Sequence, residues 1–242
     1  MLGPSLKENA RGSPTEKIFH QHIGPNLKGR DFFLGDLHGR LDALILAMGE
    51  NSFNPKCDRI IAVGDLIDRG HNSYDILKLT REPWFYSVRG NHEAMLLESN
   101  DNSSFKQWLE NGGEWFFEMA GDAIIDSFGL ALNLPTALSV ETPDGAIIGI
   151  CHAEWPQEDW ANVEKCLDDP VIANTMIWGR TVVSSKTCRW DKTAALTIHG
   201  HSFVQEITKF GTALFIDTGC VFNGKLSMID CETALRWPEA KP

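Results

Sequence analysis

Asp36 and His38 stand two residues apart, after the apolar run 32–34 and the glycine that ends it. If the backbone stays extended beyond this run, side chains two residues apart point to the same side, so both could bind one metal ion. A lone pair of this kind is weak evidence, because a turn-forming carboxylate beside a solvated histidine is common in loops. The choice between a metal site and an ordinary loop therefore depends on the rest of the chain.

Four more residues with oxygen or nitrogen donors lie near the ends of predicted strands: Asp65, Asn91, His152 and His201. The whole set contains two carboxylates, three imidazoles, one amide and no thiolate. Such donors suit divalent ions such as Mn²⁺ or Fe²⁺, and they do not suit a structural zinc site. Six ligands are too many for one ion that must also hold a substrate. They fit two ions that share Asp65, at the roughly 3.5–4 Å separation typical of two-metal hydrolases.

Three strand-loop-helix units position the first half of this set. Apolar runs predict the strands, and apolar residues at i, i+3, i+4 and i+7 predict the helices. The predicted strands are 31–34, 59–63 and 84–88, and the helices after them are 40–50, 72–81 and one that begins at Ala94. Right-handed crossovers make these strands parallel and bring their loops to one edge of the sheet, where open α/β sheets bind ligands.

The second half of the chain has a different pattern. Residues 103–128 are rich in aromatic side chains, and we predict two short helices around a glycine turn there. Packing in the core or in a lid is favoured over direct binding of substrate. Four further strands are predicted at 146–151, 195–199, 212–217 and 226–231. They indicate a second, more antiparallel sheet packed on the first.

Composition excludes several classes of protein. The chain has 242 residues, of which 43% are hydrophobic and 23% are charged, which fits one domain with a sizeable core. The net charge of −11 argues against a general nucleic-acid or anionic-membrane surface, so a phosphate ligand needs a local reversal of charge. No apolar run approaches the roughly 20 residues of a membrane span. The polar start of the chain has no signal-peptide pattern, so we expect a cytoplasmic location.

The six cysteines are scattered and contain no C-x-x-C pair, which predicts reduced structural thiols. His20 and His22 could bind a metal, but the interpretation as surface histidines is favoured. Residues 1–14 have no periodic pattern and are expected to be a flexible N-terminal tail, before one catalytic domain over 15–242.

Five blocks carry the candidate ligands: 35–39 (Gly-Asp-Leu-His-Gly), 64–70 (Gly-Asp-Leu-Ile-Asp-Arg-Gly), 90–93 (Gly-Asn-His-Glu), the strand-end His152, and 200–202 (Gly-His-Ser). Their content and order resemble the calcineurin-like metallophosphoesterases, and within them the phosphoprotein phosphatase branch. Further blocks at 108–117, 151–156, 177–180 and 216–219 resemble the group of the bacteriophage lambda protein phosphatase and its bacterial relatives. The resemblance covers about residues 30–232. It implies an α/β fold with α+β layers, in which two mixed β-sheets pack as a central sandwich flanked by helices.

The resemblance also implies a role for each motif residue. One ion would be held by Asp36, His38 and Asp65, and the other by Asp65, Asn91, His152 and His201. A hydroxide between the ions would attack phosphorus directly and in line. His92 corresponds to the general acid, with Asp68 orienting its ring. The groups implied to bind the substrate phosphate are Arg69, Arg89, Asn91 and Arg180.

This assignment supplies the local reversal of charge. Two divalent ions and two carboxylates leave about +2, a hydroxide reduces this to about +1, and arginines add to it. Two departures from the family pattern are small: Ser202 stands where the family usually has threonine, and the N-terminal tail is longer.

The resemblance implies a metal-dependent phosphomonoesterase that acts on phosphorylated serine or threonine in proteins, with tyrosine as a further candidate. Mn²⁺ is the first choice of metal, and Fe²⁺/Fe³⁺, Zn²⁺ and Mg²⁺ are alternatives. A dinucleoside polyphosphate hydrolase is the alternative enzyme. A non-enzymatic relic is disfavoured, because no ligand, acid or arginine is missing from the motifs. The target phosphoprotein and the oligomeric state stay open.

Overall fold

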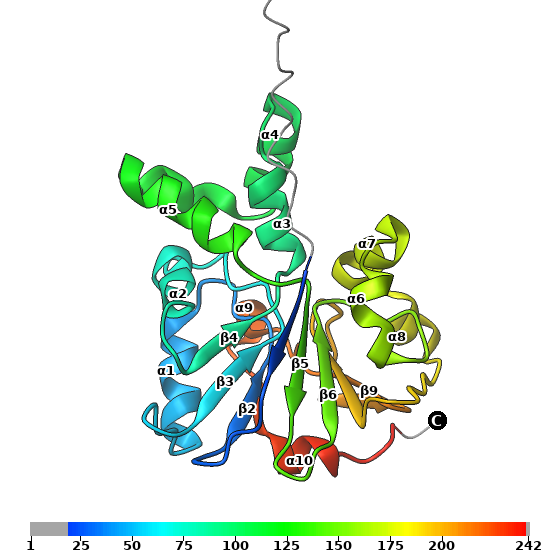
Figure 1. The fold of residues 1–242 in the computed structure, drawn as a ribbon. Helices are drawn as coiled ribbons and strands as arrows, with labels where there is room; N and C mark the ends of the chain where they lie inside the picture. The colour runs from blue at the N-terminus through cyan, green and yellow to red at the C-terminus, as the bar shows by residue number, and fades with distance from the viewer. Residues whose placement is uncertain (1–18, 241–242) are drawn as a thin grey trace, which may run out of the picture.

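Two β-sheets form the centre of the molecule, whose computed structural model describes residues 19–240 (Figure 1). The predicted tail 1–14 lies outside the described residues. The two sheets face each other, and helices cover their outer sides and one end. The predicted fold, two mixed sheets packed as a sandwich between helices, is confirmed.

The first sheet has four strands in the order β10-β2-β3-β4. Their bounds are Asp31–Leu34 for β2, Arg59–Ala62 for β3, Phe85–Ser87 for β4 and Met228–Asp230 for β10. Strands β2, β3 and β4 are parallel, as the three strand-loop-helix units predict, and β10 is antiparallel to β2. The loops after β2, β3 and β4 therefore share one edge of this sheet.

The second sheet has six strands in the order β1-β5-β6-β7-β9-β8. Their bounds are His20–Ile23 for β1, Ala137–Glu141 for β5, Ile147–Cys151 for β6, Leu196–His199 for β7, Thr208–Phe210 for β8 and Ala213–Phe215 for β9.

This sheet is mixed: the pairs β1–β5, β6–β7 and β7–β9 are parallel, and β5–β6 and β8–β9 are antiparallel. Two of its five pairs are thus antiparallel, against one of three in the first sheet, so it is slightly more antiparallel, as expected. One expectation for this sheet is wrong. The predicted strand 226–231 joins the first sheet as β10 instead. Strand β1 escaped prediction because its sequence, His-Gln-His-Ile, is polar at the edge of the sheet.

Side chains along the central strands point alternately to two faces and so belong to two separate hydrophobic cores. In β2, Phe32 and Leu34 pack toward the helices, whereas Phe33 packs between the two sheets. In β3, Ile60 and Ile61 divide in the same way. Because successive side chains of a strand point to opposite faces, a strand buried on both faces has a continuous apolar sequence. These short apolar runs were therefore the most reliable strand signal in the chain.

Helices α1 (Leu41–Glu50) and α2 (Ser73–Leu79) lie beside the first sheet (Figure 1). Helices α3 (Asn91–Glu98), α4 (Asn102–Glu110) and α5 (Gly121–Leu132) stand at one end, with the 3₁₀ helix η1 (Gly113–Glu118) between α4 and α5. The second sheet is flanked by η2 (Trp160–Asn162), α6 (Val163–Cys166), α7 (Pro170–Trp178) and α8 (Thr181–Ser185). Two short helices, α9 (Cys220–Asn223) and α10 (Cys231–Leu235), flank β10 in the sequence.

The third predicted helix begins before Ala94, because residues 91–93 form the first turn of α3. The carboxylate of Glu93 accepts a hydrogen bond from the Gly90 N–H (2.8 Å) and thereby satisfies a backbone donor at the start of the helix. The candidate residues Asn91 and His92 consequently lie on a helix N-terminus rather than on a free loop.

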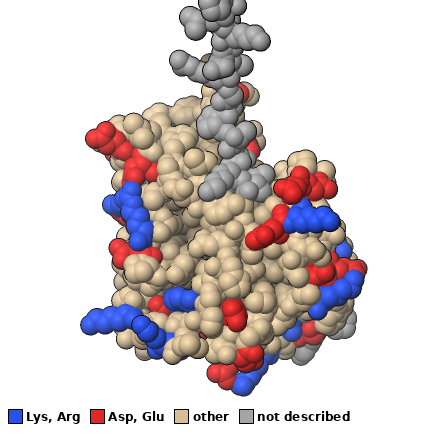
Figure 2. Space-filling model, viewed as in Figure 1, with Lys and Arg blue, Asp and Glu red and all other residues tan. Residues whose placement is uncertain are grey.

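None of the helices between residues 19 and 240 is long and apolar enough to cross a membrane. All six cysteines lie in the described part and are free thiols, as predicted. Figure 2 shows acidic and basic side chains intermingled over the face that it presents.

Candidate active site

A cavity of about 310 Å³ lies where the predicted residues converge. Eight of these residues line it: Asp36, His38, Asp65, Arg69, Asn91, His92, Arg180 and His201. His152 and Asp68 are fully buried next to it, in contact with Asn91 and His92 respectively. A larger hollow of about 560 Å³ near Arg81 contains none of these groups, so chemistry rather than size identifies the site.

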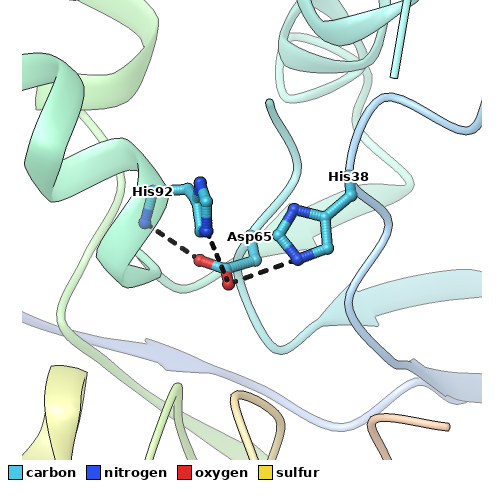
Figure 3. Close-up of side chains that lie close together, drawn as sticks. All are labelled: His38, Asp65 and His92. Atoms are coloured by element: carbon cyan, nitrogen blue, oxygen red, sulfur yellow. Dashed lines mark hydrogen bonds and ion pairs between the residues drawn. The ribbon is translucent and has the colours of Figure 1, made fainter. Parts of the chain in front are cut away.

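Asp65 is the centre of this cluster. Its Oδ2 lies 3.6 Å from His38 Nε2 and 4.0 Å from His92 Nε2, as Figure 3 shows. Its Oδ1 lies 3.3 Å from His152 Nε2 and accepts a hydrogen bond from the His92 backbone N–H (3.1 Å). The two oxygens of one carboxylate therefore face two different groups of donors.

Two groups of possible metal ligands share Asp65. One consists of Asp65, His152 and His201, and the other of His38, Asp65 and His92, with the donor atoms of each group within 4.8 Å of one another. The second group contains His92 where the sequence assignment places Asp36. The Asp36 carboxylate lines the same cavity and accepts a hydrogen bond from the His201 backbone N–H (3.0 Å).

The histidine hydrogen bonds show which nitrogen is available to an ion. The Nδ1–H of His38 donates to the Ile67 carbonyl (3.0 Å), and the Nδ1–H of His152 donates to the Val63 carbonyl (2.7 Å). In a neutral ring this leaves the lone pair on Nε2, which points toward Asp65. This is the ring orientation that a metal-binding histidine needs.

The surroundings of Asn91 fit a bound cation. Its Oδ1 lies 3.0 Å from His152 Nε2 and 2.7 Å from His201 Nδ1. His152 Nδ1 already donates to a backbone carbonyl, so a second proton on this ring would lie on Nε2, between the oxygens of Asn91 and Asp65. A proton or a metal ion at this nitrogen compensates the acceptors that converge there. Because a metal ion binds the neutral ring, a divalent ion would take the place of that proton.

Three carboxylates share this small space. Burial, together with the carboxylates of Asp217 and Asp65, raises the pKa of Asp36 well above its usual range. Burial would also raise the pKa of Asp65, but the imidazoles of His152 and His92 hold it well below its usual range. Asp217 was not selected from the sequence, although it ends the predicted strand 212–217 and so has the same strand-end position as the other candidates.

Burial and nearby charges also shift the pKa values of the imidazoles. Burial lowers the pKa of His38 to about 3 and the pKa of His201 to about 3, so both rings are neutral near pH 7. Burial also disfavours the charged form of His152, but the Asp65 carboxylate raises the pKa of this ring to about 9. His38 and His201 thus offer neutral nitrogen donors beside the buried carboxylates, whereas His152 carries a proton near pH 7 that a bound metal ion would displace.

The backbone of the site is unusual. Of the seven non-glycine residues with positive φ in the described chain, five belong to the site: His38, Asp65, Asp68, Arg69 and His201. Such left-handed residues are uncommon and cluster at functional sites. The φ of His38, 44°, corrects one step of the sequence argument: the strand ends at Leu34, so a turn rather than an extended backbone brings His38 toward the ion site.

Close packing of glycines lets the loops meet. A Cβ on Gly200 would lie 2.0 Å from Asp36 Oδ1, and a Cβ on Gly90 would lie 2.2 Å from Asp65 Oδ1. Any side chain at these positions would collide with a candidate ligand.

Glu93, on α3, holds the Asp65 loop in place through hydrogen bonds. The side chain is fully buried, and its carboxylate accepts hydrogen bonds from the backbone N–H groups of residues 65–67 and of Gly90, at 2.8 to 3.3 Å. Burial and the nearby Asp65 carboxylate raise the pKa of Glu93 to about 7. Glu93 therefore positions Asp65 without lining the cavity.

Replacing Glu93 with alanine is expected to lower the free energy of unfolding by about 3 kcal/mol or more, because each buried N–H left without an acceptor costs about 1–3 kcal/mol. Urea unfolding with an unchanged slope would measure the loss. Glu50→Ala, at an exposed position at the end of α1, is the matched control. A loss below about 1 kcal/mol would show that the loop finds other acceptors.

Two predicted arginines lie at the cavity. The Arg69 guanidinium donates to His38 Nε2 (2.8 Å) and to His92 Nε2 (2.9 Å), so it lies between the two rings. Arg180 donates to the His201 carbonyl (3.0 Å). Both can present a positive charge to an anion in the cavity.

The third predicted arginine, Arg89, donates to backbone carbonyls. Its side chain is fully buried, it donates to the carbonyls of Leu132 (3.0 Å) and Leu134 (3.1 Å), and it is not among the residues that line the cavity. The guanidinium satisfies carbonyls at the end of α5, as cations at helix C-termini do. The phosphate contact that the family resemblance implies for Arg89 stays a prediction.

His92 and Asp68 form a buried pair. The His92 Nδ1–H donates to Asp68 Oδ2 (2.7 Å), and both side chains are at most 1% exposed. This hydrogen bond leaves His92 Nε2 directed at the cavity, on the same side as Asp65 Oδ2.

Three aromatic side chains form the apolar rim of the cavity: Trp178, Phe203 and Phe222, which are 37%, 49% and 77% exposed. Phe222 lies under the Arg69 guanidinium (5.8 Å to the ring centre). Isolated aromatic residues far apart in the chain carry no shared sequence pattern, so this rim is not predictable from sequence. The aromatic stretch 103–128 is partly a packing element, as was favoured: Trp108 and Trp115 are buried in the core.

Comparisons with known proteins agree with this geometry. Residues 32–204 match the family model described as calcineurin-like phosphoesterase. The chain is 34% identical over 214 residues to serine/threonine-protein phosphatase 2 of Escherichia coli (strain K12), which covers 86% of this chain and 95% of that protein. It is 34% identical over 199 residues to serine/threonine-protein phosphatase 1 of Salmonella typhimurium, covering 81% and 88%.

The sequence match to a named nucleotide hydrolase covers a smaller part of the chain. A symmetrical bis(5'-nucleosyl)-tetraphosphatase of Yersinia pestis is 38% identical over only 68 residues, which are 27% of this chain and 24% of that protein. A solved structure described as a candidate diadenosine tetraphosphatase shares the fold with a TM-score of 0.63 and 23% identity, covering 90% of this chain and 96% of that one. A protein-tyrosine phosphatase of a Shewanella species has a TM-score of 0.51 and 14% identity, covering 94% and 82%.

Proposed function

This chain belongs to the calcineurin-like phosphoesterase family, and we propose that it is a metal-dependent protein phosphatase that hydrolyses phosphoserine and phosphothreonine. The observation that carries a two-metal phosphoesterase is the convergence of two donor groups on the two oxygens of Asp65. The choice of phosphoprotein as substrate is supported by two serine/threonine-protein phosphatases that match at least 81% of this chain.

The proposed ligands share Asp65, as the two groups around it do, but they follow the family resemblance in placing Asp36 rather than His92 at one ion and in adding Asn91 at the other. One ion would be held by Asp36, His38 and Asp65, and the other by Asp65, Asn91, His152 and His201. Mn²⁺ is proposed because the donors are oxygens and imidazole nitrogens without a thiolate. Bound ions would act as Lewis acids on the phosphate and provide a water nucleophile that is active near neutral pH.

The chain's own residues then have distinct tasks. Arg69 donates to His38 Nε2, the nitrogen that would bind an ion. With an ion there, the planar fork of Arg69 would be free for the phosphate oxygens, beside Arg180. His92 Nε2, held toward the cavity by Asp68, would donate a proton to the leaving oxygen as the phosphorus–oxygen bond breaks. The electron pair of that bond stays with the leaving oxygen, and water supplies the new oxygen on phosphorus. The products are an alcohol and inorganic phosphate.

The substrate class is tested by comparing kcat/KM for a phosphoserine peptide, a phosphotyrosine peptide and diadenosine tetraphosphate, with Mn²⁺ present. The expected order puts the phosphoserine peptide first. Faster turnover of diadenosine tetraphosphate would favour the nucleotide hydrolase instead, for which the 68-residue match is the supporting observation. No turnover of any phosphoester by the metal-loaded protein would reject the proposed activity.

Removing metal is expected to abolish hydrolysis, because Asp36, Asp65 and Asp217 then leave uncompensated negative charge where the phosphate must bind. The protein would be treated with a chelator, dialysed and assayed on the phosphoserine peptide. Adding back Mn²⁺, Fe²⁺, Zn²⁺ or Mg²⁺ one at a time identifies the ions that restore the rate. Full activity of protein shown by metal analysis to be free of metal would contradict the two-metal site.

A further inference from the structure

Asp68 receives three side-chain hydrogen bonds, although only one comes from the proposed acid. The indole Nε1–H of Trp108 lies 2.9 Å from Oδ2 and 3.1 Å from Oδ1, and the indole Nε1–H of Trp115 donates to Oδ1 at 2.7 Å. The third donor is His92 Nδ1–H, at 2.7 Å from Oδ2. All four side chains are buried, with Trp115 the most exposed at 7%.

The two tryptophans belong to one segment that packs on the Asp68 loop. Between them, the Gly112 carbonyl accepts a hydrogen bond from the Arg69 backbone N–H (2.9 Å). A Cβ on Gly112 would lie 2.6 Å from that same nitrogen, so the segment can approach the loop closely only because the residue is glycine. Residues 108–115 thus hold both the backbone and the carboxylate of the loop.

The loop needs this support. Asp68 and Arg69 have φ values of 72° and 68°, and a left-handed conformation at two consecutive non-glycine residues is costly unless neighbouring contacts maintain it. Arg69 follows Asp68 directly and presents its guanidinium to the cavity, so a shift of the loop would move the acid's partner and a phosphate-binding group together.

The hydrogen bonds also affect the charge state of the Asp68 carboxyl group. Burial raises the pKa of Asp68, which would favour a protonated carboxyl, while hydrogen bonds from His92, Trp115 and Trp108 lower it. An indole N–H can only donate, so each indole contact stabilises the charged carboxylate and occupies a lone pair. The two indoles thereby fix the orientation of the carboxylate that faces the His92 ring.

We infer that Trp108 and Trp115 are positioning residues for catalysis, which hold the Asp68 carboxylate so that His92 Nε2 faces the leaving oxygen of the substrate. This inference rests on the proposed phosphatase function and on His92 as its acid. It assigns to the segment 108–115 a task in proton transfer in addition to its packing in the core.

The test uses Trp108→Phe and Trp115→Phe in the full-length, metal-loaded protein, because phenylalanine keeps an aromatic ring in the core and removes the indole N–H, together with a loss of ring volume that the control variant reproduces. Two substrates with different leaving groups are compared. A phosphoserine peptide releases an alkoxide and needs a proton, whereas p-nitrophenyl phosphate releases a stable phenolate and does not. Each variant is expected to lower kcat on the phosphoserine peptide about 10-fold or more, as part of the 10²–10⁴-fold that general acid catalysis supplies, and to change kcat on p-nitrophenyl phosphate less than about 3-fold.

Trp160→Phe is the matched control. Trp160 is 2% exposed and donates its indole N–H to Ser139 Oγ (2.7 Å), away from the cavity. This variant is expected to change kcat on both substrates by the same factor. Metal content and the far-ultraviolet circular dichroism spectrum are measured for every variant, and if one variant does not fold, the other decides.

Equal losses on both substrates, or no loss on either, would overturn the positioning role and leave the tryptophans as core residues. These outcomes differ from failure of the proposed function itself, in which the wild-type protein would not hydrolyse the phosphoserine peptide at all.

Discussion

Replacing His92 with asparagine is expected to lower kcat on a phosphoserine peptide by about 100-fold or more, because a positioned general acid supplies about 10²–10⁴-fold. The leaving oxygen would then depart as an alkoxide without a proton from Nε2. The loss on p-nitrophenyl phosphate should be much smaller, because its leaving group is stable without protonation. Steady-state kinetics on both substrates, with KM and kcat separated, measures the effect.

Metal analysis of the same variant decides between two roles for His92. Its Nε2 lies 4.0 Å from Asp65 Oδ2, and the ring forms a possible ligand group with His38 and Asp65. If His92 is the acid, both ions stay bound in His92→Asn. If the variant loses an ion and its activity on both substrates falls equally, His92 is a ligand. Asp36→Asn then provides the comparison. It should lose an ion, while the ratio of kcat on the phosphoserine peptide to kcat on p-nitrophenyl phosphate stays as in the wild-type protein.

The part of the site that could be predicted from sequence is the part that parallel strands impose. Strands β2, β3 and β4 each have short apolar sequences, and the polar residues that follow them must meet at one edge of the sheet. Asp36, Asp65 and Asn91 therefore converge although they are far apart in the chain. The family resemblance added the order of the blocks and extended the prediction to His152 and His201, which come from the second sheet.

The remaining features depend on contacts that no local pattern encodes. Trp108 and Trp115 reach Asp68 across 40 and 47 residues, and nothing in their spacing distinguishes an indole that packs from one that donates to a carboxylate. Arg89 directly precedes the block 90–93, yet its guanidinium donates to carbonyls at the end of α5. Strand β10 pairs with β2 because tertiary packing, rather than its own sequence, selects its partner.

The assignment of Asp65 as the shared ligand leads to a prediction of larger effect. Asp65→Asn is expected to lower the affinity for both ions, because Oδ1 and Oδ2 face different donor groups and the substitution removes the negative charge from both. Loss of a ligand's second-sphere partner already costs about 10- to 100-fold in metal affinity, so loss of a charged ligand should exceed this at each ion. Activity on every phosphoester should fall below detection at metal concentrations that saturate the wild-type protein.

Asp36→Asn separates a shared ligand from an unshared one. Asp36 lies at the cavity with its carboxylate on the His201 backbone N–H, and it is proposed to hold only the ion of His38. Titration with Mn²⁺ followed by metal analysis should therefore show one weakened ion in Asp36→Asn and two in Asp65→Asn. Equal weakening of both ions in Asp36→Asn would show that the two ions bind as one unit, because release of either would then remove the charge that keeps the other in place. Selective loss in Asp65→Asn would instead remove Asp65 from its bridging position and require another oxygen donor, of which Asp217 is the carboxylate in the cavity that has no assigned ion.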